Sequence, residues 1–123
     1  MIKGQHHIAI NASERERTVA FYRDVLGFEI ESEVVRPNDR MIFMCAHGIM
    51  LEIFIDPTCP PRVSDPEAMG LRHLCFHATE LEKEHERVRA LGYEPEEIRL
   101  HPGTPYRLFF VKDPDGLPIE FHE

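Results

Sequence analysis

The chain has 123 residues, with 22 acidic against 14 basic side chains and a formal net charge of −8. This length suits one compact domain, because half of it would bury too little surface to be stable alone. The acidic balance argues against a nucleic-acid-binding protein, and no stretch approaches the roughly 20 apolar residues of a membrane span. The N-terminus lacks the apolar run of a signal peptide. We therefore expect a cytoplasmic protein that binds a small molecule and neither nucleic acid nor membrane.

The cysteines are Cys45, Cys59 and Cys75, an odd number without paired spacing. This pattern argues against a disulfide framework and fits a reducing compartment. We expect buried or chemically idle thiols at all three positions.

The first half of the chain predicts a strand, a helix and three further strands. Residues 7–10 alternate as a half-buried strand, and Ser13-Glu14-Arg15-Glu16 has the pattern of a capping box that opens a helix. Gly27 supplies the end of that helix. The apolar face of the helix comprises Val19, Tyr22, Val25 and Leu26. The extended segments that follow are 28–36, 41–46 and 49–55.

The second half repeats this order. Residues 73–76 predict the strand, Thr79-Glu80-Leu81-Glu82 the capping box, and Gly92 the end of the helix. The predicted apolar stripe is Leu81, Val88 and Leu91, and the extended segments are 93–99, 106–112 and 117–122. Asp113-Pro114-Asp115-Gly116 is a turn, because proline fixes one dihedral and glycine accepts a positive one. It should join the last two strands as a hairpin.

The two halves agree in spacing as well as in order. The opening histidine precedes the predicted cap by six positions in both halves. Between the halves, residues 57–70 contain four prolines, which exclude a helix or a central strand. We expect an α+β fold with one domain, 1–123, made of a module at about 1–56, a Pro-rich connector at 57–70 and a module at 71–123.

A histidine followed by a glutamate occurs once in each half. His7 precedes Glu52 by 45 positions, and His73 precedes Glu120 by 47. Strand alternation divides the residues of the predicted strands between two faces. The face that the helices cover should carry Ile8, Ile10, Leu51, Ile53, Ile55, Leu74, Phe76, Ile119 and Phe121. The opposite, concave face should carry His7, Ala9, Met50, Glu52, Phe54, His73, Cys75, His77, Pro118, Glu120 and His122.

Two carboxylates between large aliphatic neighbours are costly to bury unless their charge is compensated. A divalent metal ion bound by two carboxylates and two neutral imidazoles would compensate both. This ligand set suits Ni, Co or Zn, and also Mn or Fe(II). Taken singly, each histidine or glutamate is more often a structural or solvated residue than a ligand, and the equivalent positions in the two halves are what favour a shared site. His77 and His122 share the concave face, so they are candidates for substrate contact or for ordinary surface positions.

These segments together resemble a known family. The residues that carry the resemblance are His7-Ile8-Ala9-Ile10, Phe21-Tyr22, Leu26-Gly27, Leu51-Glu52-Ile53-Phe54, Leu71-Arg72-His73-Leu74, Asp113-Pro114-Asp115-Gly116 and Ile119-Glu120. They look like the vicinal oxygen chelate (glyoxalase/bleomycin resistance/dioxygenase) superfamily, and within it small bacterial glyoxalase I-like proteins, which are lactoylglutathione lyase-like.

The resemblance implies two βαβββ modules whose curved mixed sheets enclose a metal site, commonly in a homodimer. It implies four metal ligands, His7, Glu52, His73 and Glu120, with one divalent metal per site. The implied activity is a lyase or isomerase that converts a hemithioacetal of methylglyoxal and a thiol to a 2-hydroxyacyl thioester through a metal-stabilised enediolate. Glu120 is the favoured catalytic base and Glu52 the second candidate.

Other functions of the same fold remain open. In these relatives (a thiol transferase for fosfomycin, an extradiol dioxygenase or an epimerase) the metal site typically has two histidines and one terminal glutamate. Glu52 would be a fourth ligand and therefore counts against these activities. The presence of a candidate ligand at all four positions counts against a metal-free drug-binding module. Candidates for substrate contact are Arg72, His77, Phe54 and His122. An anionic substrate tail could bind Arg36, Arg62, Arg72 or Arg107, although each could equally be a solvated surface arginine.

Overall fold

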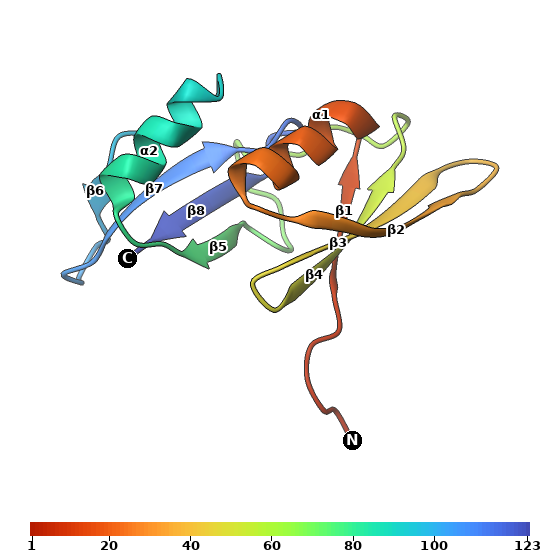
Figure 1. Ribbon diagram of the computed structural model, residues 1–123, viewed down its shortest axis with the longest axis horizontal. Helices are drawn as coiled ribbons and strands as arrows, with labels where there is room; N and C mark the ends of the chain where they lie inside the picture. Colours follow the sequence, from red (N-terminus) through yellow and green to blue (C-terminus); the bar gives the residue numbers. More distant parts are fainter. The chain divides into compact units, whose positions relative to one another are not determined.

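A computed structural model describes residues 1–123 as two compact units, Met1–Pro60 and Pro61–Glu123 (Figure 1). The first unit contains β1 (Ile8–Ala12), α1 (Arg15–Ala20), the π-helix η1 (Phe21–Val25), β2 (Glu29–Val35), β3 (Arg40–Ala46) and β4 (Ile49–Ile55). The second contains β5 (Leu74–His77), α2 (Leu81–Ala90), β6 (Arg99–Leu100), β7 (Arg107–Lys112) and β8 (Pro118–His122). The predicted order of strand, helix and three strands is confirmed in both units.

Each unit forms one mixed four-stranded sheet, with strand orders β1-β4-β3-β2 and β5-β8-β7-β6. The first strand of each unit pairs in parallel with the last, and the other pairings are antiparallel. Parallel pairing sets Ala9 opposite Glu52 and Cys75 opposite Glu120. His7 and His73 each stand one position before the first strand of their sheet. The parallel register therefore brings each histidine close to the glutamate of the last strand, Glu52 or Glu120.

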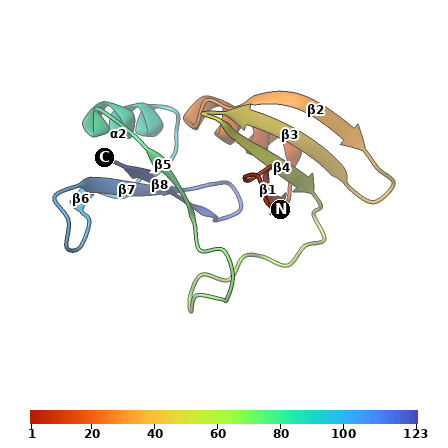
Figure 2. The same ribbon diagram turned by 90° about the horizontal axis from the view of Figure 1, so that it is seen from below.

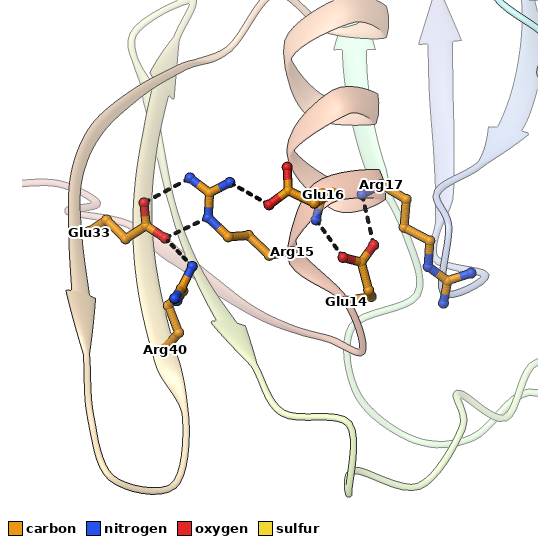
Figure 3. Close-up of polar contacts among 6 residues, drawn as sticks. All are labelled: Glu14, Arg15, Glu16, Arg17, Glu33 and Arg40. Carbon is orange, nitrogen blue, oxygen red and sulfur yellow. Dashed lines mark hydrogen bonds and ion pairs between the residues drawn. The ribbon is translucent and has the colours of Figure 1, made fainter.

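The first helix, which begins at Arg15, is capped by Glu14 and not by the predicted cap Ser13. The Glu14 carboxylate accepts hydrogen bonds from the backbone N–H groups of Glu16, at 2.8 Å, and Arg17, at 2.9 Å (Figure 3). These two bonds hold the pKa of Glu14 below its usual range, the bond from Arg17 contributing most. Ser13 Oγ instead accepts from the guanidinium of Arg17 at 2.6 Å. The longer glutamate side chain thus occupies the position expected for the serine.

Replacing Glu14 by alanine should lower the melting temperature by a few degrees at pH 7, more than Ser13→Ala does. Because the folded-state pKa of Glu14 is lowered, its contribution is present above the unfolded-state value and is lost as the pH falls through the folded-state value. The difference between wild type and Glu14→Ala should therefore shrink below about pH 4.5. Thermal unfolding followed by circular dichroism between pH 3 and pH 7 measures it. A larger effect of Ser13→Ala at pH 7 would contradict this cap.

An ion-pair group ties the start of α1 to the outer hairpin of the same sheet. Arg15 donates from Nε to Glu33 Oε1 at 2.6 Å and from Nη2 to Oε2 at 2.8 Å, and Arg40 donates to the same carboxylate at 3.0 Å (Figure 3). The bidentate Arg15 lowers the pKa of Glu33, with a smaller effect of Arg40. The first turn of the helix is thereby fixed against β2 and β3.

The second unit departs from the sequence prediction at its helix and at its third segment. Glu80 precedes α2 with a left-handed backbone, φ +52°, and no side-chain cap, so the predicted capping box at Thr79 is wrong. Leu91 is exposed, whereas His85 is buried against Phe109 with ring centroids 5.1 Å apart. Figure 2 shows α2 running along one face of its sheet.

Of the predicted strand 93–99, only Arg99 lies in a strand, the two-residue β6. Pro95 has no N–H to offer a strand ladder, and the carbonyl of Glu96 lies 2.8 Å from His85 Nε2. The backbone N–H of Glu96 donates to Phe110 O at 2.8 Å as a single crossing contact. The segment between α2 and β6 is therefore irregular.

The predicted division of the strands into two faces agrees with the burial. On the helix side, residues such as Leu51, Ile53 and Ile119 are fully buried. On the other face most side chains are exposed or half-buried, and Glu120 is the exception, being 6% exposed. The β7–β8 turn forms as predicted, because Asp113 Oδ1 accepts from the N–H of Leu117 at 2.9 Å.

The three cysteines are free thiols, and Cys75 is exposed rather than buried. No helix of the protein has the length and apolar character needed to cross a membrane.

Candidate metal centre

The first histidine–glutamate pair lies at the start of β1 and in the middle of β4. His7 Nε2 is 2.9 Å from Glu52 Oε2, and the two side chains are 34% and 14% exposed. Phe43, on β3 directly opposite Glu52, presents its ring edge-on to His7 with centroids 5.9 Å apart. The pair therefore has one open side, one aromatic wall and a largely shielded carboxylate.

The second pair repeats this arrangement at the start of β5 and in β8. His73 Nε2 is 3.0 Å from Glu120 Oε2, and the side chains are 31% and 7% exposed. Phe110, on β7 directly opposite Glu120, packs edge-on to His73 with centroids 5.2 Å apart. Although the residue is exposed, partial shielding of its sulfur from water, together with the neighbouring charge of Glu120, raises the pKa of Cys75 to about 11, which keeps this thiol protonated at neutral pH.

Phe43 and Phe110 are parts of the repeat that the sequence prediction missed. They precede their glutamates by 9 and 10 positions and take equivalent places on the central antiparallel strand of each sheet. The sequence could have indicated them, because a phenylalanine stands at nearly the same distance before the glutamate in both halves. Each ring limits the rotation of its histidine, so the imidazole nitrogen stays directed at the carboxylate.

The donor atoms suit a divalent cation. Two ligands in neighbouring positions of an octahedron, each at about 2.1 Å from the ion, are roughly 3.0 Å apart. The two observed nitrogen–oxygen separations, 2.9 and 3.0 Å, match that edge. The same separation suits a direct hydrogen bond between imidazole and carboxylate. The structure contains no group of three or more histidine, cysteine or acidic side chains placed to hold a metal ion, and each unit contributes one pair.

His6 is a further functional candidate that strand alternation did not predict. Its Nδ1 lies 2.9 Å from Nδ1 of His7. When His7 Nε2 carries the lone pair that faces a cation, Nδ1 carries the hydrogen and donates it to His6. With a cation bound, this bond would fix both the tautomer and the orientation of His7, in the way that outer-shell partners of metal ligands do.

The predicted substrate contacts are distributed as follows. Phe54 is half-buried beneath Arg36, whose guanidinium carbon lies 5.6 Å from the ring centroid. His77 is exposed and pairs in register with His122, which packs against His101 with ring centroids 5.5 Å apart. Arg72 is exposed immediately before His73. These positions remain predictions as substrate contacts.

Three of the four arginines predicted for an anionic tail are used within the protein. Arg36 donates two hydrogen bonds to Asp39, at 2.6 and 2.5 Å. Arg107 pairs with Glu123 at 2.5 Å and also with Glu82. Arg62 donates to the backbone carbonyls of Leu71 and Arg72. Of the four, only Arg72 has no such partner.

Arg62 organises the segment that leads to His73. Its Nε donates to Ser64 Oγ at 3.1 Å, and its Nη2 donates to the carbonyls of Leu71, at 3.2 Å, and Arg72, at 2.6 Å. The second carbonyl belongs to the peptide unit whose nitrogen is that of His73. One guanidinium therefore closes the Pro-rich segment on itself and fixes the backbone next to a candidate ligand.

Replacing Arg62 by alanine should speed amide hydrogen exchange at Leu71–His73 by about tenfold, because the bonds of a charged donor to two carbonyls are lost. Arg62→Lys should recover only part of this protection, since an ammonium group lacks the fork geometry. Arg36→Ala, which removes a local pair with Asp39, is the matched control and should leave that segment unchanged. Equal exchange in Arg62→Ala and wild type would remove Arg62 from this role.

The chain belongs to the Glyoxalase/Bleomycin resistance protein/Dioxygenase superfamily, whose family model matches residues 4–121. It is similar over its whole length to the uncharacterized protein YaeR of Escherichia coli (strain K12), with 39% identity over 99% of this chain and 97% of that protein. It is also similar to the crystal structure of the glyoxalase family protein from Enterococcus faecalis, with 43% identity, a TM-score of 0.93 and 98% of each chain covered.

More distant relatives show that the superfamily contains enzymes of several kinds. Catechol-2,3-dioxygenase of Bacillus subtilis (strain 168) is 31% identical over 94% of this chain and 39% of that protein. The fosfomycin resistance protein FosX of Listeria monocytogenes, in its E126Q form complexed with Mn(II), shares the fold at 22% identity, with a TM-score of 0.79 and 99% and 93% of the chains covered. The predicted family and fold are confirmed.

Proposed function

We propose that the protein is a metal-dependent glyoxalase I-like lyase, with a single divalent ion bound by His7, Glu52, His73 and Glu120. Each unit supplies one imidazole nitrogen and one carboxylate oxygen at the separation of neighbouring octahedral ligands. We propose further that the four ligands come together in a homodimer, from one chain or from two. The observation that carries the proposal is the structural repeat of the histidine, the glutamate and the aromatic wall in both units.

The proposed substrate is the hemithioacetal of a 2-oxoaldehyde, such as methylglyoxal, with a small thiol. The product is the 2-hydroxyacyl thioester. One proton leaves the carbon that bears the sulfur and is delivered to the neighbouring carbonyl carbon, while a second proton passes between the two oxygens. The reaction is an isomerisation and needs no oxidant or reductant.

Glu120 is the proposed base. It is the more buried carboxylate of the two, and shielding from water strengthens its hydrogen bonds and its charge interactions. His73 lies 3.0 Å from its Oε2, and Phe110, opposite Glu120 on β7, packs against that histidine. In the proposed reaction this orientation would present the carboxylate to the reacting carbon. A bound divalent cation would supply Lewis-acid polarisation of the two vicinal oxygens and so acidify the adjacent C–H. Glu52 and His7 would hold the cation from the other unit.

Glu52 supports this function over the other activities of the superfamily. It stands in the first unit at the place that Glu120 takes in the second, and both make the same contact with a histidine. A two-histidine, one-glutamate site has no use for a fourth ligand there. Similarity to FosX at 22% identity concerns the fold alone.

The test is a panel of metals and substrates. Protein stripped of metal should show no turnover, and Ni, Co or Zn should restore thioester formation from methylglyoxal with glutathione or with other low-molecular-weight thiols. Fosfomycin with a thiol and catechol are parallel arms. Turnover confined to either of those arms, or no thioester with any metal and thiol, would contradict the proposed function.

A further inference from the structure

A cavity of about 830 Å³ lies within the second unit and opens onto His73. Its lining includes the ring of Phe110, the three basic side chains Arg72, Arg99 and Lys112, and three glutamates. The volume falls in the range of about 300–1,000 Å³ typical of sites for small molecules. The cavity therefore places charged groups of both signs next to one candidate ligand of the metal.

The three basic side chains of this cavity have no ion-pair partner. Elsewhere in the protein, arginines such as Arg15, Arg87 and Arg107 are paired with carboxylates. The chain carries 22 acidic against 14 basic residues, so a basic side chain without an acidic partner is not explained by a shortage of acids. Three such side chains around one cavity leave positive charge that an incoming group can neutralise.

One of the three side chains, that of Arg99, and the backbone of a second residue, Arg72, are held in place. The guanidinium of Arg99 lies over the ring of Phe110, with its carbon 5.8 Å from the centroid, and the backbone of Arg72 is fixed by the guanidinium of Arg62. A pre-positioned guanidinium loses less freedom when it binds an oxyanion, which favours binding. Lys112 stands at the end of β7, in register with Pro118.

The glutamates of the lining do not cancel this charge. Glu67 lies 4.0 Å from Arg62, which is outside the cavity lining, and so is compensated there. Glu94 and Glu96 are exposed on the segment between α2 and β6. With Glu67 compensated, the lining carries three positive charges against two negative ones.

We propose that Arg72, Arg99 and Lys112 bind an oxyanion, a carboxylate or a phosphate, at the end of the substrate that points away from the reacting carbons. This inference rests on the proposed function, because it assigns the chemical class of the substrate's distal group at the same site. Arg72 is one of the four arginines predicted from the sequence for this role, whereas Arg99 and Lys112 were not among them.

Binding can be measured without turnover. In the zinc-loaded protein, NMR titration with glutarate or with inorganic phosphate should shift the signals of Arg72, Arg99 and Lys112, whereas glutaramide, the neutral analogue of glutarate, should not shift them. The double variant Arg99→Gln/Lys112→Gln should weaken anion binding by about tenfold or more, since charged hydrogen bonds are lost. Arg89→Gln, an exposed change on α2 outside the cavity, is the matched control. Undiminished anion binding in the double variant would assign the anion to the metal and overturn the proposal.

Turnover separates the two proposals. The hemithioacetal of 3-mercaptopropionate should be used with a KM about tenfold below that of 2-mercaptoethanol, and the double variant should remove this difference while leaving the neutral substrate unaffected. Equal KM values in the wild type would overturn the oxyanion site and leave the lyase function standing. Anion binding that depends on Arg99 and Lys112, without turnover of either adduct, would support the oxyanion site and contradict the lyase function.

Discussion

Replacing Glu120 by glutamine is expected to lower kcat by about 10²–10⁴-fold, the usual contribution of a positioned general base. Glutamine keeps an oxygen in the same place, so the fold and the binding of metal at saturating concentration should persist. The loss should appear in kcat rather than in KM, because the proton transfer and not substrate binding is impaired. Steady-state kinetics with methylglyoxal and excess thiol, at saturating metal, measures this change.

Two comparison variants make the result specific. Glu97→Gln, an exposed change between α2 and β6, should leave kcat unchanged. Glu52→Gln, at the equivalent position of the first unit, should reduce kcat less than Glu120→Gln does. A larger loss for Glu52→Gln would exchange the two roles, and full activity of both variants would remove the glutamates from the proton transfer.

Replacing Glu52 by alanine is expected to weaken metal binding by more than about 100-fold, since the loss of even an outer-shell partner costs roughly 10–100-fold. His7 would lose the carboxylate that lies 2.9 Å from its Nε2. Competition with a chromophoric chelator measures the affinity for Zn or Co directly. Activity should return only when the metal concentration is raised in proportion.

The matched control for this variant is Glu29→Ala, an exposed glutamate on β2 of the same unit. Its metal affinity should equal that of the wild type. Unchanged affinity in Glu52→Ala would exclude Glu52 from the ligand set and return the site to the two-histidine, one-glutamate pattern of the other enzymes in the superfamily.

The sequence predicted both sheets and both pairs because the controlling signals are periodic. Alternation along β4 and β8 put Glu52 and Glu120 on the face opposite the helices, and the parallel pairing brought His7 and His73 beside them. The closely similar spacing of the two halves, 45 and 47 positions from histidine to glutamate, made each prediction support the other. Strand alternation and the repeat each depend on many residues at once, so a departure at one residue did not change the predicted sheets or pairs.

The helix starts and the third segment of the second unit depend on individual contacts and were therefore predicted less well. Both Ser13 and Glu14 are able to cap a helix, and only the path of the backbone decides that Glu14 accepts the two N–H bonds. The segment 93–99 was expected to be extended from its place after the second helix, but Pro95 interrupts its ladder. Arg62 was considered for an anionic substrate, whereas its partners are carbonyls nine and ten residues away, which no local pattern indicates.

The central claim is that two histidine–glutamate pairs, one from each unit, form one metal site. Native mass spectrometry of the metal-loaded protein counts metal ions and chains together. One divalent ion per chain is expected, whether the four ligands belong to one chain or to two, and His7→Ala and His73→Ala should each abolish tight binding. Two weakly bound ions per chain, each lost in only one of the two variants, would show two independent pairs and contradict the account.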